Sequence, residues 1–245
     1  MGHVRLEVRE GLARIIVDNP ARANSITPSM ARQMRAACDA VDEDRSVGAA
    51  VIAGAHGTFC SGGDRDILRD VARDPADPAA FEDMSQVYDV FHRVGRLAVP
   101  TVAAVRGAAV GAGVNLLLMT DLRVVADNAR IRAGFQQLGI HPGGGHFALL
   151  GKVAGWDTCA ALGLFGVQLS GAEAASAGLA WRSVPDEEVE PLAEQLARVP
   201  AADPELARHA VRSFRTELGP PRMPFAAASD MERSYQMWSM RRSMR

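Results

Sequence analysis

The sequence is poor in residues that several classes of protein require. It has three cysteines and no CxxC motif, which argues against a disulfide framework and against a zinc site. Lysine occurs once, at Lys152, so Schiff-base chemistry has a single candidate residue. The chain has no run of about 18 apolar residues, and its polar, alternating N-terminus is unlike a signal peptide. We therefore expect no membrane span, no metal and a cytoplasmic location.

An excess of charge of one sign is also lacking. The formal net charge of the 245 residues is −2, so the sequence predicts no nucleic-acid partner. With 48% hydrophobic and 23% charged residues, the composition is typical of a globular protein and not of a disordered one. The length suits one large α/β domain, or a core domain with a small appendage.

Short apolar runs alternate with helical patterns over most of the chain. Alternating residues on both sides of Glu10-Gly11 predict a β-hairpin, and Thr27-Pro28 predicts the start of a helix that runs to about Val41. Three apolar runs without alternation predict strands that are buried on both faces, at residues 49–53, 101–105 and 122–125. Strands that alternate with helices favour a parallel sheet with crossover helices.

The pattern changes near residue 190. Before it, Ser170-Gly171-Ala172-Glu173 predicts a capping box, Gly178 a helix end, and residues 179–184 a late strand. After it, only helical patterns follow. We therefore divide the chain into a mixed α/β core, residues 1–190, and a helical segment, residues 191–245.

Two glycine-rich turns carry the strongest chemical signal. The first has the sequence FCSGGD at residues 59–64, and the second has VRGAAVGAG at residues 105–113. Each follows a predicted buried strand and precedes a predicted helix, where backbone N–H groups lack partners within the helix. Two such turns facing each other would form an oxyanion hole, which stabilises negative charge that develops on a carbonyl oxygen.

Other interpretations of these turns remain open at this point. Glycine and alanine there also permit tight turns and close helix packing, without any ligand. A nicotinamide-dependent oxidoreductase is a third alternative, although the second turn has the spacing GxxxGxG and not the GxGxxG of a dinucleotide site. A P-loop is excluded, because no GK[ST] follows.

Five segments, in unbroken order, carry a family resemblance. They are PARANSI at 20–26, FCSGGD at 59–64, the stretch 99–126, LGIHPGGG at 138–145 and the stretch 168–185. Together they resemble the crotonase (enoyl-CoA hydratase/isomerase) superfamily over about residues 5–215. The resemblance implies an α/β, crotonase-like (ClpP/crotonase) spiral of ββα units with a C-terminal helical segment for oligomerisation, as a homotrimer or a dimer of trimers. It also implies an acyl-CoA thioester as the partner, with coenzyme A as part of the substrate and no permanently bound cofactor.

The resemblance assigns roles to residues of both turns and of the PARANSI segment. The oxyanion donors would be the backbone N–H groups of Gly63 and Ala112. Coenzyme A would contact Arg22 near a phosphate, and the backbone at Ala23, Ser61 and Gly63 near the adenine. A solvated surface charge is the alternative role for Arg22.

The sequence departs from the family at the positions that transfer protons. Where hydratases carry two glutamates, this chain has Asn115 and Phe135, and neither an amide nor a phenyl ring accepts a proton near neutral pH. The aspartate of the dehalogenase and dienoyl-isomerase branches is replaced by Gly143. The two-glutamate hydratase mechanism is therefore not expected.

Histidines next to the LGIHPGGG segment are the candidate substitutes. His141 and His146 flank the turn, and histidine suits acid/base work at neutral pH. We predict His141 as the catalytic residue, with turn capping or surface exposure as the alternative for either histidine. Asn115, Phe135 and Tyr88 are predicted to line the substrate pocket. The leading hypothesis is an acyl-CoA-processing enzyme that stabilises a thioester enolate; the second is a non-catalytic acyl-CoA-binding protein.

Overall fold

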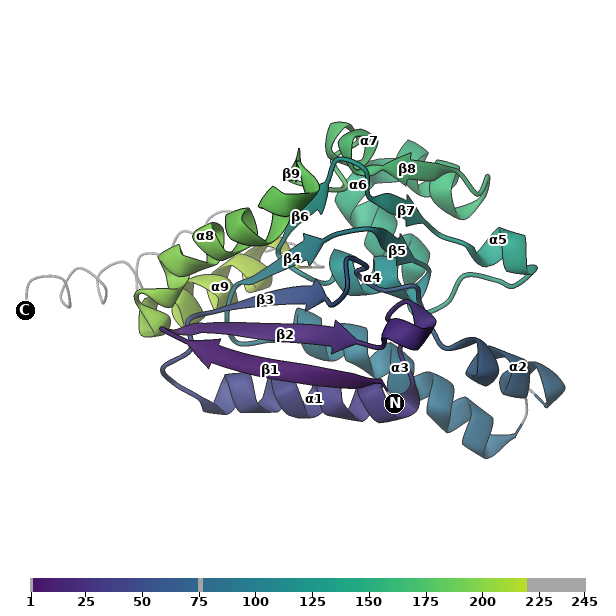
Figure 1. The fold of residues 1–245 in the computed structure, drawn as a ribbon, viewed down its shortest axis with the longest axis horizontal. Helices are drawn as coiled ribbons and strands as arrows, with labels where there is room; N and C mark the ends of the chain where they lie inside the picture. The colour runs from purple at the N-terminus through teal and green to yellow at the C-terminus, as the bar shows by residue number, and fades with distance from the viewer. Residues whose placement is uncertain (1, 75–76, 220–245) are drawn as a thin grey trace, which may run out of the picture.

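The computed structural model describes residues 2–74 and 77–219, which form a mixed α/β structure (Figure 1). Its main sheet has six strands in the order β1-β2-β3-β4-β6-β9. The β1–β2 hairpin is antiparallel, as predicted, and every other neighbouring pair is parallel. The strands are β1 (His3–Arg9), β2 (Leu12–Asp18), β3 (Ala49–Gly54), β4 (Thr101–Val105), β6 (Leu122–Ala126) and β9 (Arg182–Val184).

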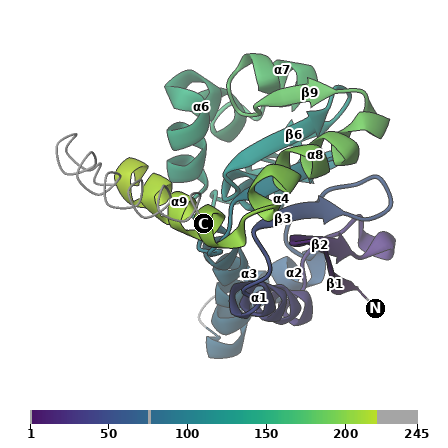
Figure 2. The same ribbon diagram turned by 90° about the vertical axis from the view of Figure 1, so that its left-hand side faces the viewer.

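Helices cover both faces of this sheet, which explains the unbroken apolar runs of its central strands. Helices α1 (Pro28–Glu43) and α3 (Pro78–Gly95) pack on one face, where Ala50 and Ile52 of β3 point. Helix α8 (Val189–Ala201) covers the other face, where Val51 and Ala53 point (Figure 2). Alternate residues of one strand therefore belong to two hydrophobic clusters.

Helix α1 begins where the sequence predicts it. The Thr27 side chain accepts a hydrogen bond from the Met30 N–H, and Pro28 occupies the first helical position. The buried side chains of the helix recur at helical spacing and include Met30, Met34 and Val41. The local signals and the burial pattern thus agree.

A second, smaller sheet was not predicted. It consists of β5 (Ala108–Val110), β7 (Arg130–Arg132) and β8 (Gln168–Ser170), with β7 in the centre. Strands of three residues are too short to show a hydrophobic period, which is why the sequence does not reveal them. Strand β5 follows β4 and precedes α4 (Ala112–Leu118), so the second glycine turn is part of a ββα unit.

Several local predictions in the later part of the chain are confirmed. Ser170 and Glu173 form the capping box of α7 (Gly171–Ser176), and Gly178 has the left-handed φ of +74° that suits a helix end. The strand predicted over 179–184 is shorter, because the N–H groups of Leu179 and Ala180 donate to the Ala174 carbonyl at the end of α7. The remaining elements are η1 (Pro20–Arg22), α2 (Arg65–Arg73), α5 (Phe135–Leu138), α6 (His146–Gly163), η2 (Asp186–Glu188) and α9 (Pro204–Leu218).

The helices that follow residue 190 are joined to the core. Val189 and Ala197 of α8 are buried against the main sheet. On α9, the Arg208 guanidinium donates to four carbonyl groups at the end of α1 and in the loop after it: Val41, Asp42, Asp44 and Val47. The division into residues 1–190 and 191–245 stays a prediction, and residues 220–245 lie outside the described part of the chain.

The structure was also searched for helices that could cross a membrane. Over residues 2–74 and 77–219, no helix is both long and apolar enough to do so.

Candidate active site

The two glycine-rich turns lie side by side, as the oxyanion-hole hypothesis requires. The Cys60 N–H donates to the Ala108 carbonyl over 3.0 Å, and the Val110 N–H donates to the Cys60 carbonyl over 3.0 Å. These reciprocal bonds form a parallel β-bridge between Cys60 and Ala109. The loop after β3 is thereby fixed to β5, immediately before α4.

The PARANSI segment joins the same assembly. The Ile26 N–H donates to the Gly62 carbonyl and the Asp64 N–H donates to the Ile26 carbonyl, over 2.8 and 3.0 Å. The Ser61 N–H donates to the Ala23 carbonyl over 3.1 Å. Three segments that are far apart in the sequence therefore meet, and they bring the predicted coenzyme A contacts together.

Both predicted donors have free N–H groups. Within the described residues, neither the Gly63 N–H nor the Ala112 N–H donates to any acceptor, whereas the neighbouring N–H groups of Gly62, Asp64 and Gly111 do. Ala112 is the first residue of α4, where a helix leaves N–H groups unpaired. Two unpaired donors on adjacent turns are what binding of a carbonyl oxygen requires.

Glycine is required for different reasons at different positions of the two turns. Gly62 has a φ of +106°, and a Cβ there would lie 2.9 Å from the Val110 carbonyl oxygen. Gly113 abuts Cys60 so closely that a Cβ would overlap the Cys60 carbonyl oxygen. A Cβ on Gly63, by contrast, would meet nothing within 4 Å, and its φ lies outside the left-handed region. Packing accounts for Gly62 and Gly113, whereas open space beside Gly63 leaves room for a ligand.

The predicted pocket residues gather around the turn at residues 142–145. Asn115 is 1% exposed, and its Nδ2 donates to the Gly143 and Gly144 carbonyls over 3.0 and 3.4 Å. Tyr88 lies against the same turn, since a Cβ on Gly143 would overlap the Tyr88 hydroxyl. The Phe135 ring lies 3.7 Å from where a Cβ on Gly111 would be. All three side chains are therefore close to the turn or to the start of α4.

His146 completes this cluster. Its Nδ1 lies 2.7 Å from Asn115 Oδ1, and its ring is 5.0 Å from the Phe135 ring, between centroids, at an interplanar angle of 68°. The residue is 1% exposed, and its Nε2 has no hydrogen-bond partner among residues 2–74 and 77–219. Burial lowers the pKa of His146 to about 4, so the imidazole is neutral at pH 7.

Comparison with known proteins shows the family. The family model described as enoyl-CoA hydratase/isomerase matches residues 7–240. The chain belongs to the enoyl-CoA hydratase/isomerase family. The resemblance drawn from the five sequence segments is thus confirmed.

Individual relatives of this family cover most of the chain. A protein of Mycobacterium tuberculosis named as a probable enoyl-CoA hydratase, EchA14, is 41% identical over 201 residues, 82% of this chain and 76% of its own length. The 1,2-epoxyphenylacetyl-CoA isomerase of Escherichia coli is 32% identical over 243 residues, 96% of this chain and 89% of its own. The crystal structure of an enoyl-CoA hydratase from Polaromonas sp. JS666 has a TM-score of 0.88 at 21% identity, covering 99% of this chain and 93% of that one. The last comparison confirms the predicted crotonase-like fold.

His141, the predicted catalytic residue, lies apart from the cluster around Asn115. Its side chain is exposed, and its Nδ1 lies 2.7 Å from the carbonyl of Pro142, the next residue. Its catalytic role stays a prediction. The sequence offered both histidines and the prediction chose His141; it could not show that His146 is the buried one, because that burial depends on how α6 packs against α4.

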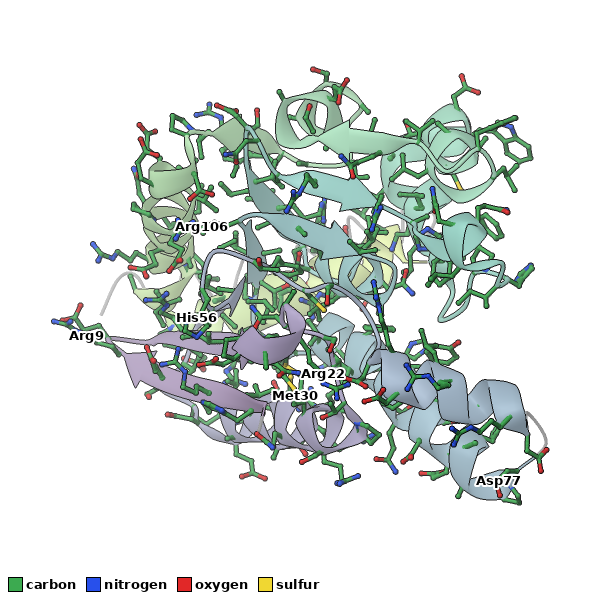
Figure 3. All side chains as sticks on the ribbon, turned by 45° about the vertical axis from the view of Figure 1, so that its right-hand side comes forward. Arg9, Arg22, Met30, His56, Asp77 and Arg106 are labelled. Carbon is green, nitrogen blue, oxygen red and sulfur yellow. The ribbon has the colours of Figure 1, made fainter. Side chains whose placement is uncertain are left out.

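Arg22 lies at the edge of the site, beside the start of α2 (Figure 3). Its side chain is 47% exposed, and its guanidinium pairs with Asp64 over 2.8 Å and with Asp66 over 2.6 Å. Asp64 caps α2 by accepting a hydrogen bond from the Asp66 N–H. The hydrogen bond from Arg22 lowers the pKa of Asp66. A phosphate that binds Arg22 would therefore compete with two carboxylates for the same guanidinium.

Cys60 has a packing role in the structure. The residue is fully buried, and burial raises the pKa of its thiol to about 12. A thiolate nucleophile is thus not available there at neutral pH.

The contrast between Gly113 and Gly63 can be tested by alanine substitution. Gly113→Ala should push the two turns apart, because the methyl overlaps a backbone atom that cannot move alone. Overpacking of this kind costs about 1–3 kcal/mol, so the Tm should fall by roughly 2–10 °C in thermal unfolding followed by circular dichroism. Gly63→Ala should keep the wild-type Tm to within about 1 °C. Equal Tm values for the two variants would contradict the assigned packing.

The lowered pKa of His146 predicts how stability depends on pH. Below the unfolded pKa of 6.5, unfolded His146 takes up a proton that the folded protein does not bind until about pH 4. Stability should therefore fall as the pH falls through this window, by about 3 kcal/mol from this residue. Urea unfolding measures the free energy of unfolding at pH 7 and at pH 4. The decrease between the two pH values should be larger in wild type than in His146→Gln by that amount. The same loss in both proteins would mean that His146 titrates normally in the folded state.

Proposed function

We propose that this protein is an acyl-CoA-processing enzyme that stabilises a thioester enolate with the N–H groups of Gly63 and Ala112. The observation that carries the proposal is that these two N–H groups have no acceptor among the described residues, on turns joined through Cys60. The family membership adds that relatives bear the names of hydratases and isomerases of CoA thioesters.

The enolate is the species that two such donors favour most. Removing a proton from the α-carbon of a thioester moves negative charge onto the carbonyl oxygen. Donors that are already oriented stabilise that charge without reorganising, and one of them is worth about 10²–10³ in rate. The N–H groups need no side-chain chemistry, so the loss of both glutamates leaves this part of the mechanism intact.

The substrate would run from the PARANSI segment toward Asn115. In this placement the nucleotide end lies near Arg22 and the backbone at Ala23, Ser61 and Gly63, and the acyl end lies near Tyr88 and Phe135. Support comes from the hydrogen bonds that hold Ala23 next to Ser61 and Ile26 next to Gly62. A homotrimer or a dimer of trimers, and a cytoplasmic location, stay predictions from the sequence.

A non-catalytic acyl-CoA-binding protein is the second candidate. It is favoured by one observation: Asn115 and Phe135 occupy the positions where the resemblance expects glutamates. The Asn115 amide already donates to the Gly143 and Gly144 carbonyls. Such a protein would keep the donors and lose the proton transfer. Binding and chemistry must therefore be measured separately.

The test combines calorimetry with hydrogen exchange. Binding of a saturated acyl-CoA is measured by titration, and loss of its α-protons in deuterated water is followed by NMR or mass spectrometry. The proposal predicts binding and enzyme-dependent exchange. Binding without exchange, and without turnover of a panel of enoyl-CoA substrates, would favour the binding protein. Absence of binding would contradict both candidates.

The role of Arg22 predicts a dependence on the nucleotide part of the substrate. Arg22→Gln should weaken acyl-CoA binding roughly two- to fivefold, since the contact is exposed, and should leave binding of the matching acyl-pantetheine unchanged. Asp66→Asn should strengthen acyl-CoA binding, because it frees Arg22 from a competing carboxylate. Arg35→Gln, which removes an exposed ion pair with Asp89 between α1 and α3, is the matched control. Equal effects on the two ligands would exclude a phosphate contact.

A further inference from the structure

We propose that His146 is the catalytic residue that transfers the substrate proton, through its Nε2 atom, and that Asn115 positions the imidazole for this task. The inference rests on the proposed function and assigns its missing proton-transfer group. Three observations support it: the directions of the hydrogen bonds around Asn115, the absence of a partner for Nε2 in the described residues, and the positions of Asn115 and His146 relative to Ala112.

The hydrogen bonds of Asn115 determine which nitrogen of His146 carries the proton. Nδ2 of Asn115 points at two carbonyl oxygens, those of Gly143 and Gly144, so it must be the amide nitrogen. Oδ1 then faces His146 Nδ1 at 2.7 Å and can only accept. Nδ1 therefore carries the hydrogen, and Nε2 has a free lone pair.

The burial of that lone pair has no structural explanation. Buried polar atoms in folded proteins almost always have partners, because an unpaired one costs free energy. His146 is 1% exposed, and no donor in the described part of the chain lies within hydrogen-bond distance of Nε2. A buried proton acceptor without a partner is a candidate for a group that acts on a ligand.

Its location fits the reaction. Asn115 is three residues after Ala112 on α4, about 4.5 Å along the helix axis, so the residue that holds the imidazole and the oxyanion donor share one helical turn. On the other side, Phe135 contacts both the His146 ring and the space next to Gly111. The imidazole thus lies between the two positions where the sequence comparison expects glutamates.

Access to Nε2 requires a movement. The atom has no exposed surface, and the Phe135 ring packs edge-on against the imidazole. The acyl group can reach Nε2 only when side chains that cover the ring move, and Phe135, on the short helix α5, is one of them. Phe135 is then a cover for the catalytic group and not a substitute for a glutamate.

One imidazole is sufficient for a balanced reaction on a 3-enoyl-CoA. The C–H bond at the α-carbon breaks, the proton goes to Nε2, and the electron pair enters the dienolate whose oxygen is held by Gly63 and Ala112. The imidazolium then returns the proton to the γ-carbon, which gives a 2-enoyl-CoA and neutral His146. No water, oxidant or second acid takes part. Because burial holds the pKa of His146 near that of a carboxylic acid, the return of the proton is easy.

The main test compares His146→Gln with wild type in three assays: acyl-CoA binding, α-proton exchange, and conversion of a 3-enoyl-CoA to the conjugated isomer followed by absorbance. Exchange and conversion should fall about 10²- to 10⁴-fold, with the acyl-CoA Kd within about twofold of wild type. His92→Gln, an exposed histidine on α3, is the matched control and should keep both activities. His146→Gln with activity near that of wild type overturns the proposal, as does a loss confined to His141→Gln.

Other outcomes separate this proposal from the proposed function. A wild-type protein that binds acyl-CoA without exchange or conversion overturns the role of His146 and leaves a binding protein. A wild-type protein that binds no acyl-CoA removes the proposed function itself.

A spectroscopic measurement on the wild-type protein tests the positioning role of Asn115. It also tests the proposal if the His146→Gln variant does not fold. ¹⁵N NMR of the histidine side chains in wild type should show His146 with a protonated Nδ1 and an unprotonated Nε2 at pH 7. Asn115→Leu should lose that tautomer preference, whereas a purely structural asparagine would leave it in place. A protonated Nε2 in wild type would overturn the proposal, whatever the variants do.

Discussion

The site depends on a pair of backbone hydrogen bonds between Cys60 and β5. They join a loop that follows β3 to a strand that follows β4, and so place Gly63 and Ala112 on adjacent turns. No side chain takes part, so the pairing tolerates sequence change provided that the two backbones can approach. Gly113 makes that approach possible, since any side chain there would overlap Cys60. The parallel order of β3 and β4 in the main sheet brings the two strands to this point.

Around this backbone frame, the positions where the resemblance expects glutamates hold Asn115 and Phe135, and the buried imidazole of His146 lies against both. Asn115 no longer has a proton to exchange, but it connects the turn at Gly143 and Gly144 with His146. A carboxylate at position 115 would repel those two carbonyl oxygens, so the asparagine, the tight turn and the histidine form one consistent set. Tyr88 belongs to the same set, because its hydroxyl occupies the space that a side chain at position 143 would need.

Much of the fold was accessible from the sequence, because local chemistry determined it. The apolar runs of β3, β4 and β6, the Thr27 cap and the capping box at Ser170 are signals that act within a few residues. The three-residue strands of the second sheet were missed, since they exist only through pairing with each other. The free N–H groups could be predicted from the family resemblance. The burial of His146 could not, because it arises from contacts between α4, α5 and α6 that no local pattern encodes.

The main-chain amides of Gly63 and Ala112 are proposed to polarise one thioester carbonyl. Isotope-edited infrared spectroscopy of an acyl-CoA carrying ¹³C at that carbonyl measures this polarisation directly, because hydrogen bonding weakens the C=O bond. The carbonyl stretch of the bound thioester should lie at lower frequency than that of the same compound free in water. A bound carbonyl whose frequency equals or exceeds the free value would show that Gly63 and Ala112 do not hold it.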